Sequence, residues 1–324
     1  MIAPWLAPAW STLAARLANG SLPHAILVGG PAGLGKRAFA SALEAALLCE
    51  RRGTDGHACG ACRGCRLRIA GTHPDLYRVS YALNDKGEPR SEIVVDQIRG
   101  LGDALVKTSQ FGGWRVATID PAEALNANSS NALLKTLEEP PPSAVLVLVS
   151  DRPERLVATI RSRCQRVDAR FPPRESALAW LAARGIGAAD AAQALELAAG
   201  NPGQAAAYAD PELRALATEV VKDLSGLASG AQSAADVAGR WVKDRPESRL
   251  ELAAELARVG AWRNAGAGSG AGIEGLARLT RAADLYKLAA WWDRTNLVRA
   301  QLATPLRSDL LLFEVLNEFR ELAA

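Results

Sequence analysis

A strong net charge is absent from this sequence: 38 Lys and Arg residues nearly balance 35 Asp and Glu residues, for a formal charge of +3 at pH 7. No field over the whole surface would therefore attract nucleic acid, although a local basic surface is still possible. A long apolar run is also missing, because no stretch approaches the roughly 18 uninterrupted apolar residues of a membrane-spanning helix. Residues 1–5 lack the positive region and apolar core of a signal peptide. We therefore expect a cytoplasmic protein without membrane contact, in which thiols stay reduced.

Two catalytic parts are missing from an otherwise clear ATP-site signature. Residues 30–37, GPAGLGKR, fit the phosphate-loop pattern G-x-x-x-x-G-K-[ST] except at the last position, where Arg37 replaces the hydroxyl that ligates Mg²⁺. The β-rich run 116–119 is followed by Asp120, and Pro121 then stands where a second acid usually polarises the attacking water. The candidate nucleotide-binding residues are Gly30, Gly33, Gly35, Lys36 and Asp120.

The residues that remain predict a phosphate-loop fold that does not hydrolyse ATP. Backbone N–H groups of such a loop cradle phosphates at a helix N-terminus, and Lys36 would reach the β- and γ-phosphates. An arginine has five N–H donors and no acceptor, so Arg37 cannot ligate Mg²⁺, and its cation would lie where the metal should bind. Glu123 is interpreted as a favourable charge at a helix N-terminus rather than as a displaced base. Binding of ATP or ADP stays open, because the glycines and Lys36 are retained.

Apolar runs alternate with helical patterns over the first half of the chain. Three short runs are nearly all apolar, as is typical of strands buried on both faces of a parallel sheet. They are residues 24–28, 114–119 and 144–150. Helical periodicity covers 36–48 and 122–139, and three prolines at 140–142 end the second helix. This alternation predicts a doubly wound α/β phosphate-loop domain over about residues 1–168.

Composition changes after residues 171–173, which are interpreted as a linker. The rest of the chain is rich in Ala and Leu and contains no convincing strand. A short helical module to about Tyr208 and a longer all-helical region are expected, the latter broken by a flexible Gly/Ala/Ser connection at 264–272. The Trp291–Trp292 pair and residues 306–322 carry apolar stripes, which indicate either core packing or a subunit interface.

Four of the five cysteines lie in one segment with the spacing C-x9-C-x2-C-x2-C. In a reducing compartment this spacing favours a tetrahedral zinc site over disulfides. Four thiolates leave no open coordination position, so the zinc would be structural and would order an insert at about residues 49–70. The predicted ligands are Cys49, Cys59, Cys62 and Cys65.

Alternatives to a purely structural zinc site stay open from the residues alone. An iron–sulfur cluster could use the same cysteines, and His57 could substitute for one ligand, although a solvated loop histidine is the simpler interpretation. The insert could also bind DNA through Arg63, Arg66 and Arg68, or these residues could form a solvated charged face.

Several motifs resemble the clamp-loader branch of the AAA+ ATPases. Residues 131–141, NALLKTLEEPP, are close to that branch's signature, and Ser162, Arg163 and Cys164 match its S-R-C motif. The cysteine cluster, the segment GTHPD at 71–75 and the damaged ATP site agree with a non-hydrolysing member. These motifs span residues 22–168, whereas the helical remainder agrees only in length and class.

The resemblance implies a AAA+ (RecA-like) domain with a zinc insert, a helical lid domain over 169–208 and a C-terminal collar domain over 209–324. Members of this branch form a pentameric ring that loads a sliding clamp on primed DNA. The S-R-C arginine, here Arg163, reaches the ATP site of a neighbouring subunit as a trans arginine finger, where planar donors meet charge on the transferred phosphoryl group. The implied partners are gamma/tau-type and delta-type subunits, the sliding clamp and primer–template DNA.

DNA contact is also implied by the resemblance, through phosphates and without sequence readout. Residues 94–99 resemble the segment near that surface, and Arg99 is the candidate phosphate contact, with an ordinary surface arginine as the alternative. Gly203 stands where active members carry a lid arginine that senses the γ-phosphate. Nucleotidyl transfer has no acidic pair to support it, so a polymerase activity would be credited only through the complex. The competing hypotheses are an active gamma/tau-like motor ATPase and a zinc-dependent nucleic-acid-binding module.

Overall fold

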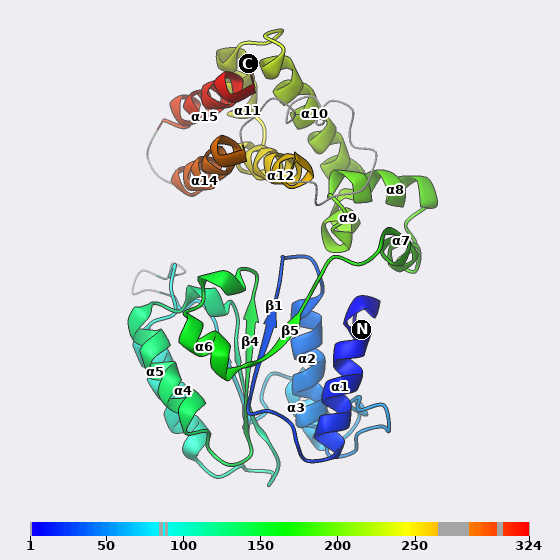
Figure 1. The fold of residues 1–324 in the computed structure, drawn as a ribbon, viewed down its shortest axis with the longest axis vertical. Helices are drawn as coiled ribbons and strands as arrows, with labels where there is room; N and C mark the ends of the chain where they lie inside the picture. The colour runs from blue at the N-terminus through cyan, green and yellow to red at the C-terminus, as the bar shows by residue number, and fades with distance from the viewer. Residues whose placement is uncertain (1, 84–86, 88–89, 265–284, 303–306, 324) are drawn as a thin grey trace. The chain divides into compact units, whose positions relative to one another are not determined.

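The computed structural model describes residues 2–83, 87, 90–264, 285–302 and 307–323 (Figure 1). The chain divides into two compact units, Met1–Pro172 and Pro173–Ala324. The boundary falls within the segment expected to be a linker. Among the described residues, no helix is long and apolar enough to cross a membrane.

A five-stranded parallel sheet, in the order β2-β3-β4-β1-β5, organises the first unit. The three strands expected from apolar runs are β1, β3 and β4, and every residue of each is buried. The two edge strands are only partly buried, so their sequences carry no comparable apolar run. The strands are β1 (Ala25–Gly29), β2 (Leu76–Val79), β3 (Arg115–Ile119), β4 (Ala144–Ser150) and β5 (Gln165–Asp168).

Helices cover both faces of this sheet, and each face has its own apolar core (Figure 1). One core lies under α1 and α2, and the other lies under α4, α5 and α6. The expected doubly wound α/β phosphate-loop domain is therefore confirmed. The helices are α1 (Ala7–Ala18), α2 (Lys36–Leu47), α4 (Val95–Val106), α5 (Ala127–Glu138) and α6 (Ala158–Arg163).

The helix expected over 122–139 is shorter than predicted. Residues Ala122–Ala124 form a separate 3-10 turn, η2, and α5 begins only at Ala127. The side chain of Asn126 accepts a hydrogen bond from the backbone N–H of Ser129 at 3.0 Å and so caps the helix. The helical periodicity of the sequence does not reveal this cap, because η2 also buries apolar residues and so continues the pattern.

Glu44 ties the phosphate-loop helix α2 to the sheet. Its side chain is only 3% exposed, and it accepts hydrogen bonds from Thr118 Oγ1 at 2.7 Å and Arg78 Nη2 at 2.5 Å. Both partners come from neighbouring strands, β3 and β2. This buried carboxylate therefore fixes α2, the helix that follows the phosphate loop, against β2 and β3.

The Glu44→Leu substitution is expected to lower the free energy of unfolding of the first unit by about 2 kcal/mol, because the Thr118 hydroxyl would stay buried without its partner. Urea unfolding followed by circular dichroism measures this change. The exposed Glu154→Leu serves as the control and should shift the midpoint little. Equal midpoints for the two variants would contradict the anchoring role of Glu44.

Within its described residues, the second unit contains only helices. One continuous apolar core runs from Ala177 to Phe319, and buried Asp223 accepts a hydrogen bond from the indole Nε1–H of Trp241 at 2.8 Å. The division into lid and collar domains stays a prediction, and most of the expected flexible connection at 264–272 lies outside the described residues. The helices are α7 (Arg174–Ala182), α8 (Ala188–Leu197), α9 (Pro202–Tyr208), α10 (Pro211–Ala228), α11 (Ala234–Trp241), α12 (Pro246–Asn264), α14 (Leu285–Gln301) and α15 (Ser308–Ala323).

The apolar stripes of α14 and α15 contain both buried core residues and exposed apolar residues. Trp291 is buried, and its indole Nε1–H donates to the carbonyl of Val315 at 2.8 Å. Leu297, Leu310 and Phe313 are instead exposed on the same two helices. Core packing therefore explains part of each stripe and leaves these three apolar side chains at the surface.

Candidate functional sites: a self-paired phosphate loop, a cysteine cluster and an exposed arginine

The phosphate loop connects β1 to α2 and depends on glycine at three positions. Gly30, Gly33 and Gly35 have φ angles of 135°, 80° and 83°, in the region that side chains other than glycine rarely adopt. A Cβ atom at Gly30 would also lie 2.2 Å from the carbonyl oxygen of Ala169. The loop backbone therefore has the form that the sequence motif predicts.

Lys36 points into the protein rather than toward an open phosphate site. The residue is 2% exposed, and its Nζ lies 2.6 Å from the carbonyl oxygen of Pro31 and 2.6 Å from Oδ1 of Asp151. Burial lowers the pKa of Lys36, and the hydrogen bond to Asp151 opposes that shift. The lysine expected to bind phosphate is thus already paired with a carboxylate of the same chain.

Asp151 was not identified from the sequence, although a signal existed. It directly follows β4, and β4 pairs with β1, so the ends of these parallel strands bring Asp151 beside the phosphate loop. Burial acts to raise the pKa of Asp151, but hydrogen bonds from Arg37 and Lys36 outweigh it and hold the pKa below its usual value.

Arg37 bridges two carboxylates at the position where a metal-binding hydroxyl was expected. Its Nε lies 2.9 Å from Oδ2 of Asp120, and its Nη2 lies 3.0 Å from Oδ2 of Asp151. Burial raises the pKa of Asp120, although Arg37 acts in the opposite direction. One guanidinium therefore contacts both carboxylates, and we call Lys36, Arg37, Asp120 and Asp151 the internal ion cluster.

Glu123 lies in the first turn of η2 and supports this cluster through the backbone. Its Oε1 accepts a hydrogen bond from the backbone N–H of Asp151 at 3.0 Å. The side chain that sequence analysis assigned to a helix N-terminus therefore also fixes the end of β4. The loop is further engaged by Trp5, whose indole Nε1–H donates to the carbonyl of Leu34 at 2.9 Å.

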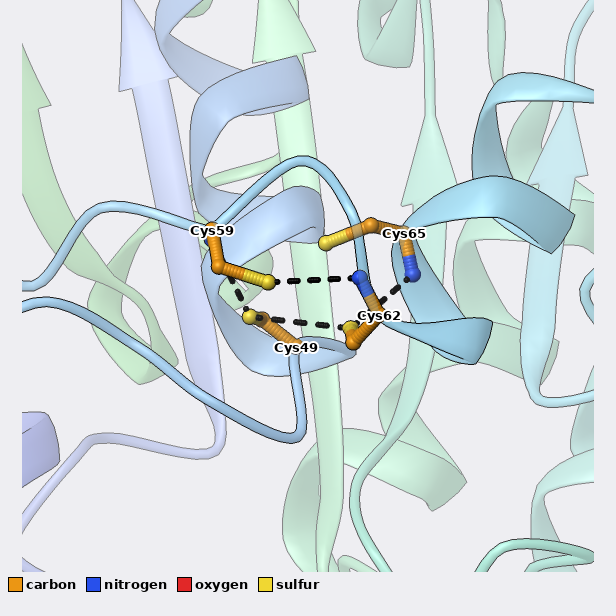
Figure 2. A group of neighbouring side chains, drawn as sticks. All are labelled: Cys49, Cys59, Cys62 and Cys65. Carbon is orange, nitrogen blue, oxygen red and sulfur yellow. Dashed lines mark hydrogen bonds between the residues drawn. The ribbon is translucent and has the colours of Figure 1, made fainter.

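The four predicted cysteine ligands come together in one cluster (Figure 2). Their sulfur atoms all lie within 4.8 Å of one another, and the Sγ atoms of Cys49 and Cys62 are 3.9 Å apart. Tetrahedral Zn–S bonds of about 2.3 Å place sulfur atoms roughly 3.8 Å apart, so the arrangement fits zinc. Cys49 lies just beyond α2, and Cys62 and Cys65 belong to the start of α3 (Arg63–Ile69).

Backbone N–H groups around the cluster favour thiolates. Cys59 N–H donates to Cys49 Sγ at 3.3 Å, Cys62 N–H to Cys59 Sγ at 3.3 Å, and Cys65 N–H to Cys62 Sγ at 3.4 Å (Figure 2). The backbone N–H groups of Ala61 and Cys62 lower the pKa of Cys59 to about 6. Burial instead raises the pKa of Cys65 to about 12, so the backbone favours the thiolate at Cys59 but not at every cysteine of the cluster. The fifth cysteine, Cys164, lies in the core under α6, where burial raises its pKa to about 12.

His57 is exposed and lies outside the group of four cysteines, and its ring contacts an aromatic side chain. Its ring stacks on Trp10 with 4.5 Å between centroids and 15° between planes, and it does not belong to the cysteine group. The exposed side chain agrees with the expected solvated loop histidine, to which the structure adds the contact with Trp10. Stacking on an α1 aromatic side chain attaches the insert to the sheet domain and explains the histidine without a metal.

The three insert arginines considered for DNA contact all have partners within the chain. The Arg63 guanidinium lies 4.6 Å from the centre of the Phe111 ring. Arg66 Nη1 donates to the carbonyl of Ala61 at 2.9 Å, and Arg68 Nη1 donates to Ser41 Oγ at 3.3 Å. Arg63 and Arg66 stay exposed despite these contacts, so the DNA contact and the solvated charged face both stay predictions.

Arg163 is the last residue of α6, and its side chain is 37% exposed. Its Nη2 lies 2.7 Å from Oε1 of Glu138, and its Nη1 donates to the carbonyl of Thr159 at 3.1 Å. Arg166, the third arginine of this segment, pairs instead with Asp168 at 3.0 Å. Arg163 is thus accessible at the surface and held in a defined direction.

Arg99 and Gly203 lie on different units. Arg99 is on α4, and its side chain is 70% exposed. Its Nη1 lies 3.6 Å from Oδ1 of Asp96. The residue lines a groove of about 810 Å³ between α4 and α5. Gly203 is the second residue of α9, and its N–H donates to the capping side chain of Asn201 at 3.1 Å. Arg99 as a DNA contact and Gly203 as the replaced sensor therefore stay predictions.

Comparison with known proteins identifies relatives of the first unit and beyond. A sequence model of the family described as "DNA polymerase III, delta subunit" matches residues 6–173. DNA polymerase III subunit delta′ of Pseudomonas aeruginosa is 41% identical over 244 residues, covering 74% of this chain and 71% of that protein. Subunit delta′ of Escherichia coli is 40% identical over 206 residues, covering 63% and 60%.

More distant similarity extends to a second kind of subunit. DNA polymerase III subunit tau of Bacillus subtilis is 34% identical over 157 residues, covering 48% of this chain and 26% of that protein. A solved Thermotoga maritima structure, described as a DNA polymerase III gamma subunit-related protein, superposes with a TM-score of 0.46 at 19% identity and covers 97% of this chain and 99% of that chain. By its family match and its delta′ relatives, the chain belongs to the delta′ subunits of the DNA polymerase III clamp loader.

Proposed function

We propose that this chain is a non-hydrolysing clamp-loader subunit that activates the ATP site of a neighbouring subunit through Arg163. The internal ion cluster is the observation that supports the first claim, that the chain does not hydrolyse ATP. Arg37 pairs with Asp120 and Asp151, and Lys36 pairs with Asp151, so the groups that would bind Mg²⁺ and phosphate are already neutralised. No intrinsic catalysis is expected, and polymerase activity belongs to the holoenzyme as a whole.

Arg163 supports the second half of the proposal. Arg163 is the arginine of the S-R-C motif, is exposed and ends a short helix. Such an arginine can offer planar donors to phosphate oxygens of another subunit. The neighbour would be a gamma/tau-type subunit, with a delta-type subunit completing the pentameric ring. The ring would act in the cytoplasm on the sliding clamp and on primer–template DNA, with Arg99 as a candidate phosphate contact.

The second unit would join this ring through its helical collar. Leu297, Leu310 and Phe313 are large apolar side chains exposed on α14 and α15, and apolar and aromatic residues are typical of the core of a subunit interface. The cysteine cluster would hold one structural zinc ion, which neutralises thiolate charge and orders the insert.

The Arg37→Thr substitution tests whether the internal ion cluster closes the nucleotide site. We expect the affinity of the pure chain for Mg²⁺–ATP to rise at least about tenfold, because a cation is removed and a metal-ligating hydroxyl is supplied. Hydrolysis should stay absent, since Pro121 still replaces the second acid. Equilibrium binding of a fluorescent ATP analogue measures the change.

Arg37→Met is the matched control, because it removes the charge without supplying a hydroxyl. It should gain less affinity for Mg²⁺–ATP than Arg37→Thr. Tight binding by the native chain, unchanged in both variants, would refute the closed site. Steady hydrolysis by the native chain alone would instead favour the motor ATPase.

A further inference from the structure

Arg163 is restrained by two contacts that leave part of its guanidinium unused. Nη1 donates to the carbonyl of Thr159, one turn back on α6, and Nη2 pairs with Glu138 on α5. A guanidinium has five N–H donors, and these contacts use two of them. Two of its three nitrogen atoms are therefore fixed in direction, while three N–H groups can still meet an incoming anion.

Glu138 is the partner of Arg163 on α5. It is the last residue of α5, where the helix dipole disfavours negative charge. The Glu138 side chain is half exposed, so it contributes little to the buried core. Its one ion pair among the described residues is the contact with Arg163, at 2.7 Å. The end of α5 is thus a mildly unfavourable place for a carboxylate, and the pair with Arg163 offsets this cost.

We infer that Glu138 is a positioning residue for Arg163, which rests on the proposed role of Arg163 as a trans arginine finger. Glu138 and the Thr159 carbonyl hold one side of the guanidinium, so the remaining donors are oriented before the neighbouring subunit arrives. A flexible arginine side chain loses conformational freedom when it is fixed, and prior restraint reduces this loss during the reaction. Glu138 does not touch the substrate and acts only through Arg163.

The test uses the complete clamp loader, rebuilt with native chain, Glu138→Ala, Glu138→Gln or Arg163→Ala. The kcat and KM of ATP hydrolysis are measured with clamp and primed DNA, after equal assembly has been verified. Glu138→Ala should lower kcat about three- to fivefold with little change in KM, as expected for one exposed charge pair. Glu138→Gln should recover part of kcat, because its amide oxygen can still accept a hydrogen bond.

Two controls separate positioning from a general structural effect. Glu139→Ala removes the adjacent exposed carboxylate, which has no ion pair with Arg163 among the described contacts, and should leave kcat unchanged. Glu138→Ala should cause no further loss in a chain that already carries Arg163→Ala, because its effect passes through that arginine.

The outcomes also distinguish this inference from the proposed function. A loss with Arg163→Ala but none with Glu138→Ala would overturn the positioning role and leave the arginine finger intact. An equal loss from Glu138→Ala in both backgrounds would make Glu138 merely structural. No loss with Arg163→Ala would refute the proposed function and, with it, the role of Glu138.

Discussion

Replacing Arg163 with alanine is expected to lower the DNA- and clamp-stimulated ATPase rate of the rebuilt clamp loader by at least about tenfold. Arginines supplied in trans contribute about 10³–10⁵ to the rates of well-studied GTPases, and a machine limited by conformational steps would show less. The Arg163 side chain lies at the surface and is 37% exposed, so its removal should not disturb the fold. The measurement is steady-state ATP hydrolysis by the complete complex.

Arg166 provides the matched control for this experiment. It lies three residues further along the chain, is exposed, and pairs with Asp168 of its own strand. Arg166→Ala removes the same charge from the same region and should retain most of the rate. Equal rates for native chain and Arg163→Ala, in complexes that assemble equally, would reduce this subunit to a structural member of the ring.

Removal of metal from the cysteine cluster is expected to unfold the insert and lower the melting temperature of the first unit by roughly 10 °C. Structural zinc contributes on the order of 10 kcal/mol of binding free energy, of which several kcal/mol should appear as folding stability. Each kcal/mol shifts the melting temperature of a domain of this size by about 2–4 °C. Thermal melts with and without a chelator, together with metal analysis, measure the effect.

Cys62→Ser should reproduce the effect of the chelator, because Cys62 is buried and its sulfur both contacts Cys49 and caps α3. Cys164→Ser is the control outside the cluster and should keep the full metal content. Trypsin should cleave Cys62→Ser faster within the insert, which contains Arg51, Arg52, Arg63, Arg66 and Arg68. A native chain that carries no metal would refute the site, and a coloured iron-containing chain would favour the cluster alternative.

Much of the first unit was predictable, because its signals are local. Strands β1, β3 and β4 are buried along their whole length, so composition alone identifies them. The phosphate loop requires glycine at fixed steps, and the cysteine spacing brings four sulfur atoms within 4.8 Å of one another. Each of these features can be read within a short window of sequence.

The missed features depend on contacts between distant segments. Asp151 matters because β4 pairs with β1, and a sequence window around either strand does not contain that pairing. Glu138 and Arg163 are 25 positions apart (163 − 138) and meet only because α5 packs against α6. His57 stacks on Trp10 across an even longer separation, so its environment could not be inferred from its neighbours.

The internal ion cluster also has an evolutionary consequence. Restoring a hydroxyl at position 37 would return only one element, since Lys36 would still pair with Asp151 and Pro121 would still occupy the place of an acid. We therefore expect hydrolysis to require more than one substitution, and the loss of Arg37 would leave Asp120 without its ion pair while Asp151 kept Lys36. We therefore expect a return to hydrolysis to pass through a chain in which Asp120 lies beside Asp151 with no guanidinium between them, an arrangement less stable than the present one.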